Sequence, residues 1–378
     1  MIKRYLQEPL TLNLKKGHVT VLFGARRTGK TTLMNAVMES LAGKRILHAN
    51  GEDYDMAQVL SSQRQEVLAN LVAGFEYFFI DEAQNVPGIG KSLKLLVDTQ
   101  PNISVFATGS ASFDLKNQVG EPLTGRSRFF TLYPFALSEM ESGYFSTLQK
   151  LPTYMVYGSY PQVIMEDNLK EKRHLLESIR NGYLLKDILQ LENVKDSLFV
   201  MNLLRALAFQ VGNDVSFNEL ASKLGTTVKT VQRYIELLEK SFIIFRLNGF
   251  SRNLRKEISK TPRFYFWDNG IRNVVISNFN PLEMRDDVGK LWENLCIAER
   301  LKKQNYLESF SNFYFWRTYD QQEIDLIEET DGRLKSFEFK WGIKETKAPR
   351  GFRENYPDAD FFTINRNNLY EFLGFQAI

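Results

Sequence analysis

The chain is poor in the residues that build disulfides and zinc sites. Its 378 residues include one cysteine and three histidines, at Cys296, His18, His48 and His174. A single cysteine excludes a disulfide framework within the chain, and the scattered histidines do not have the spacing of a zinc site. The sequence also lacks an apolar signal segment and any apolar run long enough to cross a bilayer. We therefore expect a cytoplasmic protein without membrane association.

An excess of charge of one sign is missing as well. Lysine and arginine number 48 against 45 aspartates and glutamates, which leaves a net charge of +3. No global basic field favours nucleic acid, so a surface that binds nucleic acid must be local. The apolar fraction of 43% is ample for packed cores, and the length allows two or three domains.

One short motif indicates a site for nucleotide phosphates. Residues 24–31 fit the spacing G-x-x-x-x-G-K-[ST], after a strand-like run at 18–23 and before a helical pattern at 32–38. Such a loop surrounds phosphates with backbone N–H groups, its lysine adds a positive charge, and its last hydroxyl ligates Mg²⁺. The phosphate-binding residues that we predict are Gly24, Ala25, Arg26, Arg27, Thr28, Gly29, Lys30, Thr31 and Thr32.

Two acids follow an apolar run that is typical of a buried parallel strand, at 77–82. We predict that Asp81 binds Mg²⁺ together with Thr31, and that Glu82 polarises the attacking water, which favours hydrolysis over transfer to another substrate. A third apolar run precedes Ser110, which we predict to sense the γ-phosphate, with Thr108 as the alternative. A helix cap after this strand is an equally good interpretation of the two hydroxyls.

The pattern of elements suggests three parts. Residues 1–195 alternate strands and helices up to about 140 and then become mostly helical, which predicts an α/β nucleotide-binding domain with a helical lid. Residues 196–250 have helix-turn-helix spacing, with a capping box at Ser216 and a turn at Gly225. Residues 251–378 form the third part.

The helix-turn-helix segment and the basic run after it could contact DNA. Its second helix exposes Lys229 and Arg233, and the following run contains Arg252, Arg255 and Lys256. These side chains predict a surface that contacts DNA phosphates. Because such modules also serve as docking sites for proteins, a protein partner is the alternative.

The third part contains a hairpin whose register follows from its turn. If Asp331 and Gly332 occupy the centre of a two-residue turn, Asp325 faces Glu338, while Ile324 faces Phe339 on an apolar side. Two carboxylates with Cβ atoms about 5 Å apart repel each other unless a cation lies between them. We predict a Mg²⁺ or Mn²⁺ site at Asp325 and Glu338. A solvated charged face is the alternative.

Two further residues belong with this pair. Lys340 follows Glu338 on the same face, where it could steady a phosphate or activate water, unless Glu323 neutralises it. Glu293 lies upstream on a helical pattern, in an apolar neighbourhood that is unusual for a surface acid.

The motifs at 21–33, 80–84 and 107–110 together resemble a prokaryotic AAA-type family of the AAA+ superfamily, described as predicted ATPases. The resemblance extends over nearly the whole chain and implies ATP as the nucleotide. It also implies that Arg126, in the segment after the third strand, is an arginine finger for a neighbouring subunit, with Arg128 as the reserve. An arginine paired with an acid of its own subunit is the alternative.

The C-terminal region resembles a winged helix followed by a PD-(D/E)xK nuclease-like domain. That resemblance matches Glu293, Asp325, Glu338 and Lys340 to the catalytic residues of the nuclease family, with Ile324 where the motif has proline. The implied fold is a P-loop AAA-type ATPase with a helical lid, then a winged helix, then a restriction-endonuclease-like α/β domain.

These observations predict a Mg²⁺-dependent ATP hydrolase that acts on DNA and self-associates through the arginine finger. Its nucleotide state would control a C-terminal module that binds DNA, with DNA cleavage as a further activity of that module. The rival hypothesis is a switch ATPase whose C-terminal parts bind protein partners or a promoter and cleave nothing.

Overall fold

The structure is a computed structural model that describes residues 2–109, 123, 125–140, 143–184, 197–251 and 261–374. The chain folds into two compact units that divide between Tyr133 and Pro134. The boundaries predicted at 195 and 250 remain predictions. No described helix is both long and apolar enough to span a bilayer.

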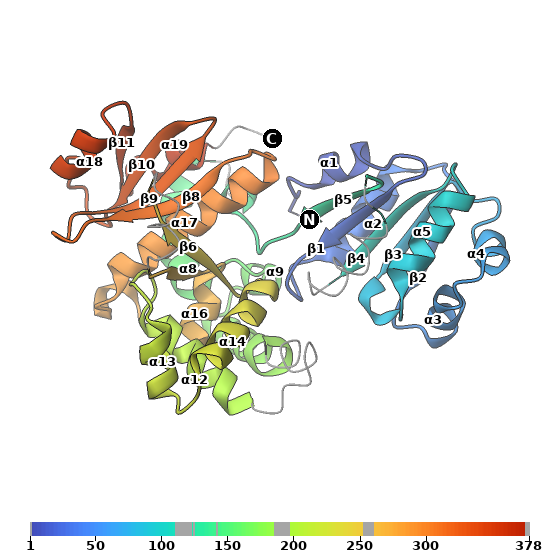
Figure 1. The fold of residues 1–378 in the computed structure, drawn as a ribbon, viewed down its shortest axis with the longest axis horizontal. Helices are drawn as coiled ribbons and strands as arrows, with labels where there is room; N and C mark the ends of the chain where they lie inside the picture. The colour runs from blue at the N-terminus through green and yellow to red at the C-terminus, as the bar shows by residue number, and fades with distance from the viewer. Residues whose placement is uncertain are drawn as a thin grey trace. The chain divides into compact units, whose positions relative to one another are not determined.

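The first unit is a parallel sheet with helices between its strands (Figure 1). The strand order is β2-β3-β4-β1-β5, and each neighbouring pair is parallel. The strands are β1 (Val19–Phe23), β2 (Ile46–Asn50), β3 (Tyr77–Asp81), β4 (Ser104–Gly109) and β5 (Ser127–Thr131). The helices are α1 (Gln7–Leu12), α2 (Lys30–Ser40), α3 (Tyr54–Ser61), α4 (Gln65–Leu71) and α5 (Ile89–Thr99).

The apolar runs of the sequence became the central strands of this sheet. Every residue of β1 and β4 is buried, as is all of β3 after its first residue. Strands covered on both faces read as continuous apolar runs, which is why the pattern identified them. Because the strands are parallel, the ends of β1, β3 and β4 lie at one edge, where loops between strands and helices build ligand sites.

The second unit begins with helices and continues into a mixed sheet (Figure 1). The helices of the predicted lid, α8 (Tyr144–Tyr157), α9 (Pro161–Ile164) and α10 (Leu169–Ile179), belong to this unit. Both α8 and α10 pack against α16 (Asn269–Val275). Their helical character is confirmed, and their role as a lid stays a prediction.

The predicted helix-turn-helix corresponds to α13 (Phe217–Lys223) and α14 (Val228–Lys240), and α12 (Ser197–Phe209) precedes it. The Ser216 hydroxyl accepts the N–H of Glu219 at 3.3 Å, and the Thr227 hydroxyl accepts the N–H of Thr230 at 3.2 Å. The first is the cap that the sequence indicated, and in both a side-chain oxygen satisfies an otherwise unpaired helix N–H.

The sheet of the second unit has the order β11-β10-β9-β8-β6-β7. It joins β6 (Ile244–Gly249) and β7 (Arg263–Phe266), which flank the boundary predicted at 250, to the strands of the C-terminal region. Those strands are β8 (Asn312–Arg317), β9 (Glu323–Thr330), β10 (Arg333–Phe339) and β11 (Asp360–Ile364), with helices α17 (Val288–Tyr306), α18 (Arg350–Asn355) and α19 (Leu369–Leu373). The helix-turn-helix segment and the C-terminal region therefore share one sheet.

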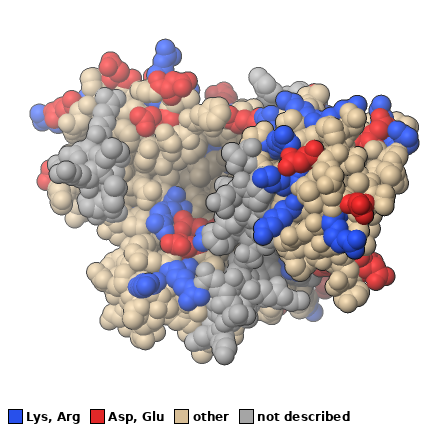
Figure 2. Space-filling model, turned by 45° about the vertical axis from the view of Figure 1, so that its right-hand side comes forward, with Lys and Arg blue, Asp and Glu red and all other residues tan. Residues whose placement is uncertain are grey.

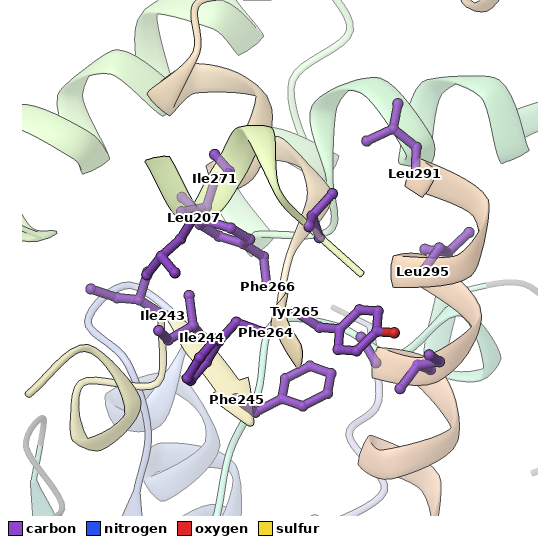
Figure 3. Close-up of a cluster of buried hydrophobic side chains, with 14 of the residues drawn as sticks. Leu207, Ile243, Ile244, Phe245, Phe264, Tyr265, Phe266, Ile271, Leu291 and Leu295 are labelled. Carbon is purple, nitrogen blue, oxygen red and sulfur yellow. The ribbon is translucent and has the colours of Figure 1, made fainter. Parts of the chain in front are cut away.

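They also share one apolar core. Residues of β6, β7 and α17 lie together in it, and Figure 3 shows the Tyr265 hydroxyl pointing toward the helix that carries Leu291 and Leu295. The segments on either side of residue 250 are thus packed as one body.

The hairpin register is confirmed from the turn to Phe337 and needs correction beyond it. The ladder pairs Arg333 with Thr330 and continues to Phe337 with Leu326. The predicted pairing of Ile324 with Phe339 is not observed, because β9 has an irregularity against β8 at this point. Ile324 packs with Trp316, whereas Phe339 packs in the core that contains Leu326 and Phe337. Such a bulge rotates a side chain from one face to the other.

Candidate nucleotide site and carboxylate site

The predicted phosphate loop connects β1 to α2 at the carboxyl edge of the first sheet. Gly24 has a φ of 159°, and a Cβ atom there would lie 2.2 Å from the carbonyl oxygen of Leu132. Gly29 has a φ of 94°, in the region that favours glycine. The loop therefore needs both glycines of the motif for its backbone path.

Lys30 begins α2 and points back into this loop. It is 5% exposed, and its Nζ donates to the carbonyl oxygens of Gly24 and Ala25, both at 3.0 Å. Its ammonium group is therefore held against the backbone of the loop, where it can meet a phosphate oxygen.

A hydroxyl and a carboxylate meet beside the loop. The Thr31 hydroxyl donates to Asp81 Oδ2 at 2.7 Å, and the other oxygen of Asp81 accepts the hydroxyl of Thr108. The fit of Mg²⁺ rests on this pair, because hydroxyl and carboxylate oxygens are the hard donors that Mg²⁺ selects. The structure thus brings together the two predicted Mg²⁺ ligands, which lie 50 residues apart in sequence.

Glu82 follows Asp81 in a left-handed conformation, with a φ of 50°. Its N–H donates to the Thr108 hydroxyl at 3.0 Å, and its carboxylate accepts the side-chain amide of Gln84. Thr108, the alternative to Ser110, is therefore hydrogen-bonded to the Asp81 carboxylate and to the backbone N–H of Glu82. Ser110 lies outside the described residues.

Arg4 is a component of this site that the motif search missed. It is 7% exposed, and its guanidinium donates to the carbonyl oxygens of Thr28 in the phosphate loop, at 3.1 Å, and Tyr133, at 2.7 Å. A buried arginine needs such partners. Arg4 ties the loop to the end of the first unit, and nothing in the local sequence around it indicates this role.

The second site lies where β9, β10 and α17 meet. We define the carboxylate site as Glu293, Asp325, Glu338 and Lys340. Glu293 is 5% exposed and Asp325 is 6% exposed, so both carboxylates are out of solvent. The N–H of Phe339 donates to Asp325 Oδ2 at 2.9 Å, and Lys340 Nζ donates to Glu338 Oε1 at 2.6 Å.

Glu338 and Asp325 do not form a ladder pair, since the regular ladder ends at Phe337. Glu323 forms an ion pair with Arg263 at 2.9 Å, and Lys340 forms one with Glu338. The predicted neutralisation of Lys340 by Glu323 is therefore not observed. Asp325 does not lie directly opposite Glu338, as it would in an uninterrupted hairpin.

Asp325 and Glu338 both have a raised pKa. Burial, and next the charge of Glu293, raise the pKa of Asp325 to about 7. Burial, and next the charge of Asp325, raise the pKa of Glu338. Burial acts to lower the pKa of Lys340, but its hydrogen bond and charge interaction with Glu338 raise it. The site therefore holds more negative charge than its lysine compensates.

One oxygen of the site lacks a partner among the described residues. Glu338 Oε2 is buried and accepts no hydrogen bond from any of them. A divalent cation would satisfy this oxygen and relieve the repulsion among the carboxylates, so the donor set fits Mg²⁺ or Mn²⁺. Within the described ranges, however, no three acids, histidines or cysteines are gathered closely enough to form a complete metal cage. Water or substrate oxygens would have to complete the coordination.

Glu293 is held by two residues that sequence reasoning missed. Tyr265 donates its hydroxyl to Glu293 Oε1 at 2.8 Å, and Lys290 Nζ lies 3.1 Å from Oε2. Gly212 has a φ of 71°, and a Cβ there would be 2.7 Å from Glu293 Oε1. Tyr265 lies in an aromatic strand that reads as ordinary core, which is why no sequence signal marked it.

Three family models match successive parts of the chain. Residues 16–141 match the model described as AAA domain. Residues 148–282 match "Domain of unknown function (DUF8612)", and residues 288–373 match "Domain of unknown function (DUF4143)". The first match contains the phosphate loop, Asp81 and Glu82, and the structure supplies the parallel sheet that such a loop requires. The first unit is an AAA-like ATPase domain.

Three relatives align with most of this chain. A protein of Haemophilus influenzae is 26% identical over 94% of this chain and 92% of its own. A protein of Methanocaldococcus jannaschii is 24% identical over 86% of this chain and 75% of its own length. A protein of Mycobacterium tuberculosis is 27% identical over 89% of this chain and 72% of its own length. All three are described as uncharacterized proteins, so they add no activity to the AAA-like ATPase domain.

Two solved structures have a more distant likeness. The Walker-type ATPase of Pyrococcus abyssi has a TM-score of 0.47 at 15% identity and covers 73% of this chain and 96% of its own. The Pif1 helicase of Candida albicans has a TM-score of 0.28 at 14% identity, over 48% of this chain and 54% of its own. At these TM-scores we draw no conclusion from either likeness.

Arg126 lies away from the phosphate loop of its own AAA-like domain. It immediately precedes β5, which pairs in parallel with β1, so it lies at the edge where the strands begin, opposite the loop. Its guanidinium forms an ion pair with Asp98, and both side chains are substantially exposed. This is the alternative that the sequence left open, and the position excludes action on the nucleotide of the same subunit.

The DNA-binding predictions are only partly placed by the structure. Lys229 and Arg233 are both exposed on α14, as expected. Arg252, Arg255 and Lys256 lie outside the described residues. Figure 2 shows lysines and arginines interspersed with acids on the face that it draws, in keeping with a net charge of +3.

Proposed function

We propose that this protein is a Mg²⁺-dependent ATP hydrolase that acts on DNA, and that its nucleotide state controls a C-terminal module that binds and cleaves DNA. The observation that carries the proposal is the bond between Thr31 and Asp81 beside the phosphate loop. A hydroxyl and a carboxylate in this position are what a nucleotide-bound Mg²⁺ requires.

Each residue of the nucleotide site has a role in this proposal. Lys30 binds the phosphates, and Thr31 and Asp81 hold Mg²⁺, which supplies charge stabilisation when it is bound. Glu82 orients and polarises the attacking water. Thr108 fixes Asp81 and the backbone of Glu82 in place, which keeps the two acids at a constant separation.

The cleavage part of the proposal rests on the carboxylate site. Asp325 and Glu338 would hold a divalent cation, and the unpartnered Glu338 Oε2 is the observation that supports this. Lys340 would steady the phosphate under attack. Glu293, fixed by Tyr265 and Lys290, would complete the acidic site.

DNA is expected to stimulate the ATP turnover of the wild-type protein, and DNA binding is expected to weaken steeply as salt rises, because phosphate contacts release counterions. Both are measured with one duplex, by coupled ATPase assay and by fluorescence anisotropy over a range of KCl concentrations. A flat salt response together with unstimulated turnover would favour the rival hypothesis, a switch ATPase that binds proteins.

Arg126→Ala is expected to lose ATP turnover while it still binds ATP, since we propose that Arg126 acts on the nucleotide of a neighbouring subunit. Mixing it with Lys30→Ala should restore part of the activity, because a mixed pair contains one site with both residues intact. The measurement is the turnover of the mixture against each variant alone. If the mixture shows no ATP turnover, Arg126 does not act on a neighbouring subunit, and its role is limited to the ion pair with Asp98.

A further inference from the structure

The carboxylate site occupies one edge of the second sheet. Strand β10 is antiparallel to β9 and parallel to β11. The start of β9 and the ends of β10 and β11 therefore lie at the same edge (Figure 1). Asp325 is near the start of β9 and Glu338 is near the end of β10. The segments that follow β10 and β11 must leave the sheet beside these two acids.

Those two segments carry exposed cations. We define the basic rim as Lys344 and Lys347, after β10, and Arg366, after β11. All three are exposed, and none of them forms an ion pair with any described residue. The nearby Arg350 differs, because it is paired with Glu354 at 2.7 Å. No described acid is thus paired with the three cations of the basic rim, and the exposed Glu345 beside Lys344 lowers the net charge of the same segment by one.

Contacts with the sheet and α17 hold the rim beside the carboxylate site. The Arg366 guanidinium lies 4.8 Å from the centre of the Trp341 ring, which packs edge-on at 5.5 Å against Trp292, the residue before Glu293. The Thr346 N–H donates to Thr363 Oγ1 at 3.0 Å, and Thr363 is paired with Glu338 across the β10–β11 ladder. Arg366 therefore lies over a packed aromatic ring, and Lys344 and Lys347 lie on either side of Thr346, which is hydrogen-bonded to the sheet.

Cations placed around buried acids suit a particular ligand. The carboxylates repel a polyanion, so a nucleic-acid strand needs attraction on either side to come near them. Lysine and arginine contacts to phosphates supply most of the sequence-independent affinity of proteins for DNA. A stacked guanidinium loses little freedom when it binds a phosphate.

We propose that the basic rim binds the phosphate backbone of DNA and holds the strand against the carboxylate site. This inference rests on the proposed function, since it assigns the DNA-holding surface of the same site. It adds a surface separate from Lys229 and Arg233 on α14.

The test is the salt dependence of DNA binding, measured by fluorescence anisotropy with a short labelled duplex, in EDTA and without nucleotide. Lys344→Ala/Lys347→Ala should weaken binding and reduce the magnitude of the negative slope of log K against log salt by about 1.8, since each phosphate contact contributes about 0.9. Arg366→Ala should reduce that magnitude by about 0.9. The matched control is Arg333→Ala/Lys335→Ala, which removes two exposed cations at the opposite, hairpin end of β10.

The outcomes separate this inference from the function that it extends. If the wild type binds DNA and the rim variant keeps its slope, the inference is wrong and DNA binding stands. An equal loss in the rim and control variants also overturns it, because the effect would then be one of total charge. If the wild type does not bind DNA at any salt concentration, the proposed action on DNA is wrong, and so is the proposed role of the basic rim.

Discussion

Lys30→Ala is expected to abolish ATP turnover, lowering the rate at least about a hundredfold, as removal of a preorganised charge at a reacting phosphate does in other sites. Lys30 is buried against the loop and bonded to two of its carbonyl oxygens, so its ammonium group is held at this point of the loop. The measurement is steady-state ATP hydrolysis, together with nucleotide binding by calorimetry.

The control for this substitution is Lys91→Ala, which removes an exposed lysine from α5 of the same domain. It should hydrolyse ATP like the wild type. Because Lys30 also contributes to the loop, thermal melting of both variants shows whether the domain remains folded. Turnover retained in a folded Lys30→Ala protein would remove the central assignment.

The fold of the first unit could be predicted because its signals are local. Continuous apolar runs of five or six residues identify strands that are buried on both faces, and β1, β3 and β4 follow them closely. The phosphate loop is likewise a contiguous motif. The arrangement of the second sheet could not be foreseen in this way, because no contiguous motif links β6 to β8, the strand with which it pairs.

The candidate sites show the same division. Thr31 and Asp81 were predictable, because Thr31 belongs to the phosphate-loop motif and Asp81 ends an apolar run that is typical of a buried strand. Arg4 and Tyr265 were not, since each acts through long-range hydrogen bonds. Arg4 donates to the Thr28 and Tyr133 carbonyl oxygens, and Tyr265 donates to Glu293. Periodicity reports which face of an element is buried, and it carries no information about which polar atom a buried side chain meets.

The hairpin shows both the strength and the limit of reasoning from a turn. The central Asp331 and Gly332 fixed the register as far as Phe337, because a two-residue turn leaves only one pairing. Beyond Phe337, β9 has an irregularity in its pairing with β8, which the turn does not influence. In this region the Asp325 carboxylate accepts the N–H of Phe339.

Asp325→Asn is expected to abolish metal-dependent DNA cleavage, by at least about a hundredfold, while ATP turnover stays at the wild-type level. Asparagine keeps an oxygen that can accept the Phe339 N–H, so the backbone of the site is preserved. It removes the charge that a divalent cation needs. The measurements are cleavage of linear, supercoiled and branched DNA with Mg²⁺ or Mn²⁺, and ATP hydrolysis of the same preparation.

Stability provides a second measurement that does not depend on cleavage. The pKa of Asp325 is raised to about 7 in the folded protein, above its unfolded value, so the fold favours the neutral carboxyl group. Its contribution to stability is complete below the unfolded pKa and is lost as the pH rises through about 7. In EDTA above that pH, Asp325→Asn should therefore melt at a higher temperature than the wild type, whose ionised carboxylate remains without a cation.

Addition of Mn²⁺ should reverse this order. The cation binds the folded wild type and raises its melting temperature, whereas the variant has lost a ligand and gains little. Asp331→Asn, in the hairpin turn at the other end of the strand pair, is the control and should respond to Mn²⁺ like the wild type. If Mn²⁺ stabilises Asp325→Asn as much as it stabilises the wild type, the cation binds elsewhere. The carboxylate site would then not be a metal site.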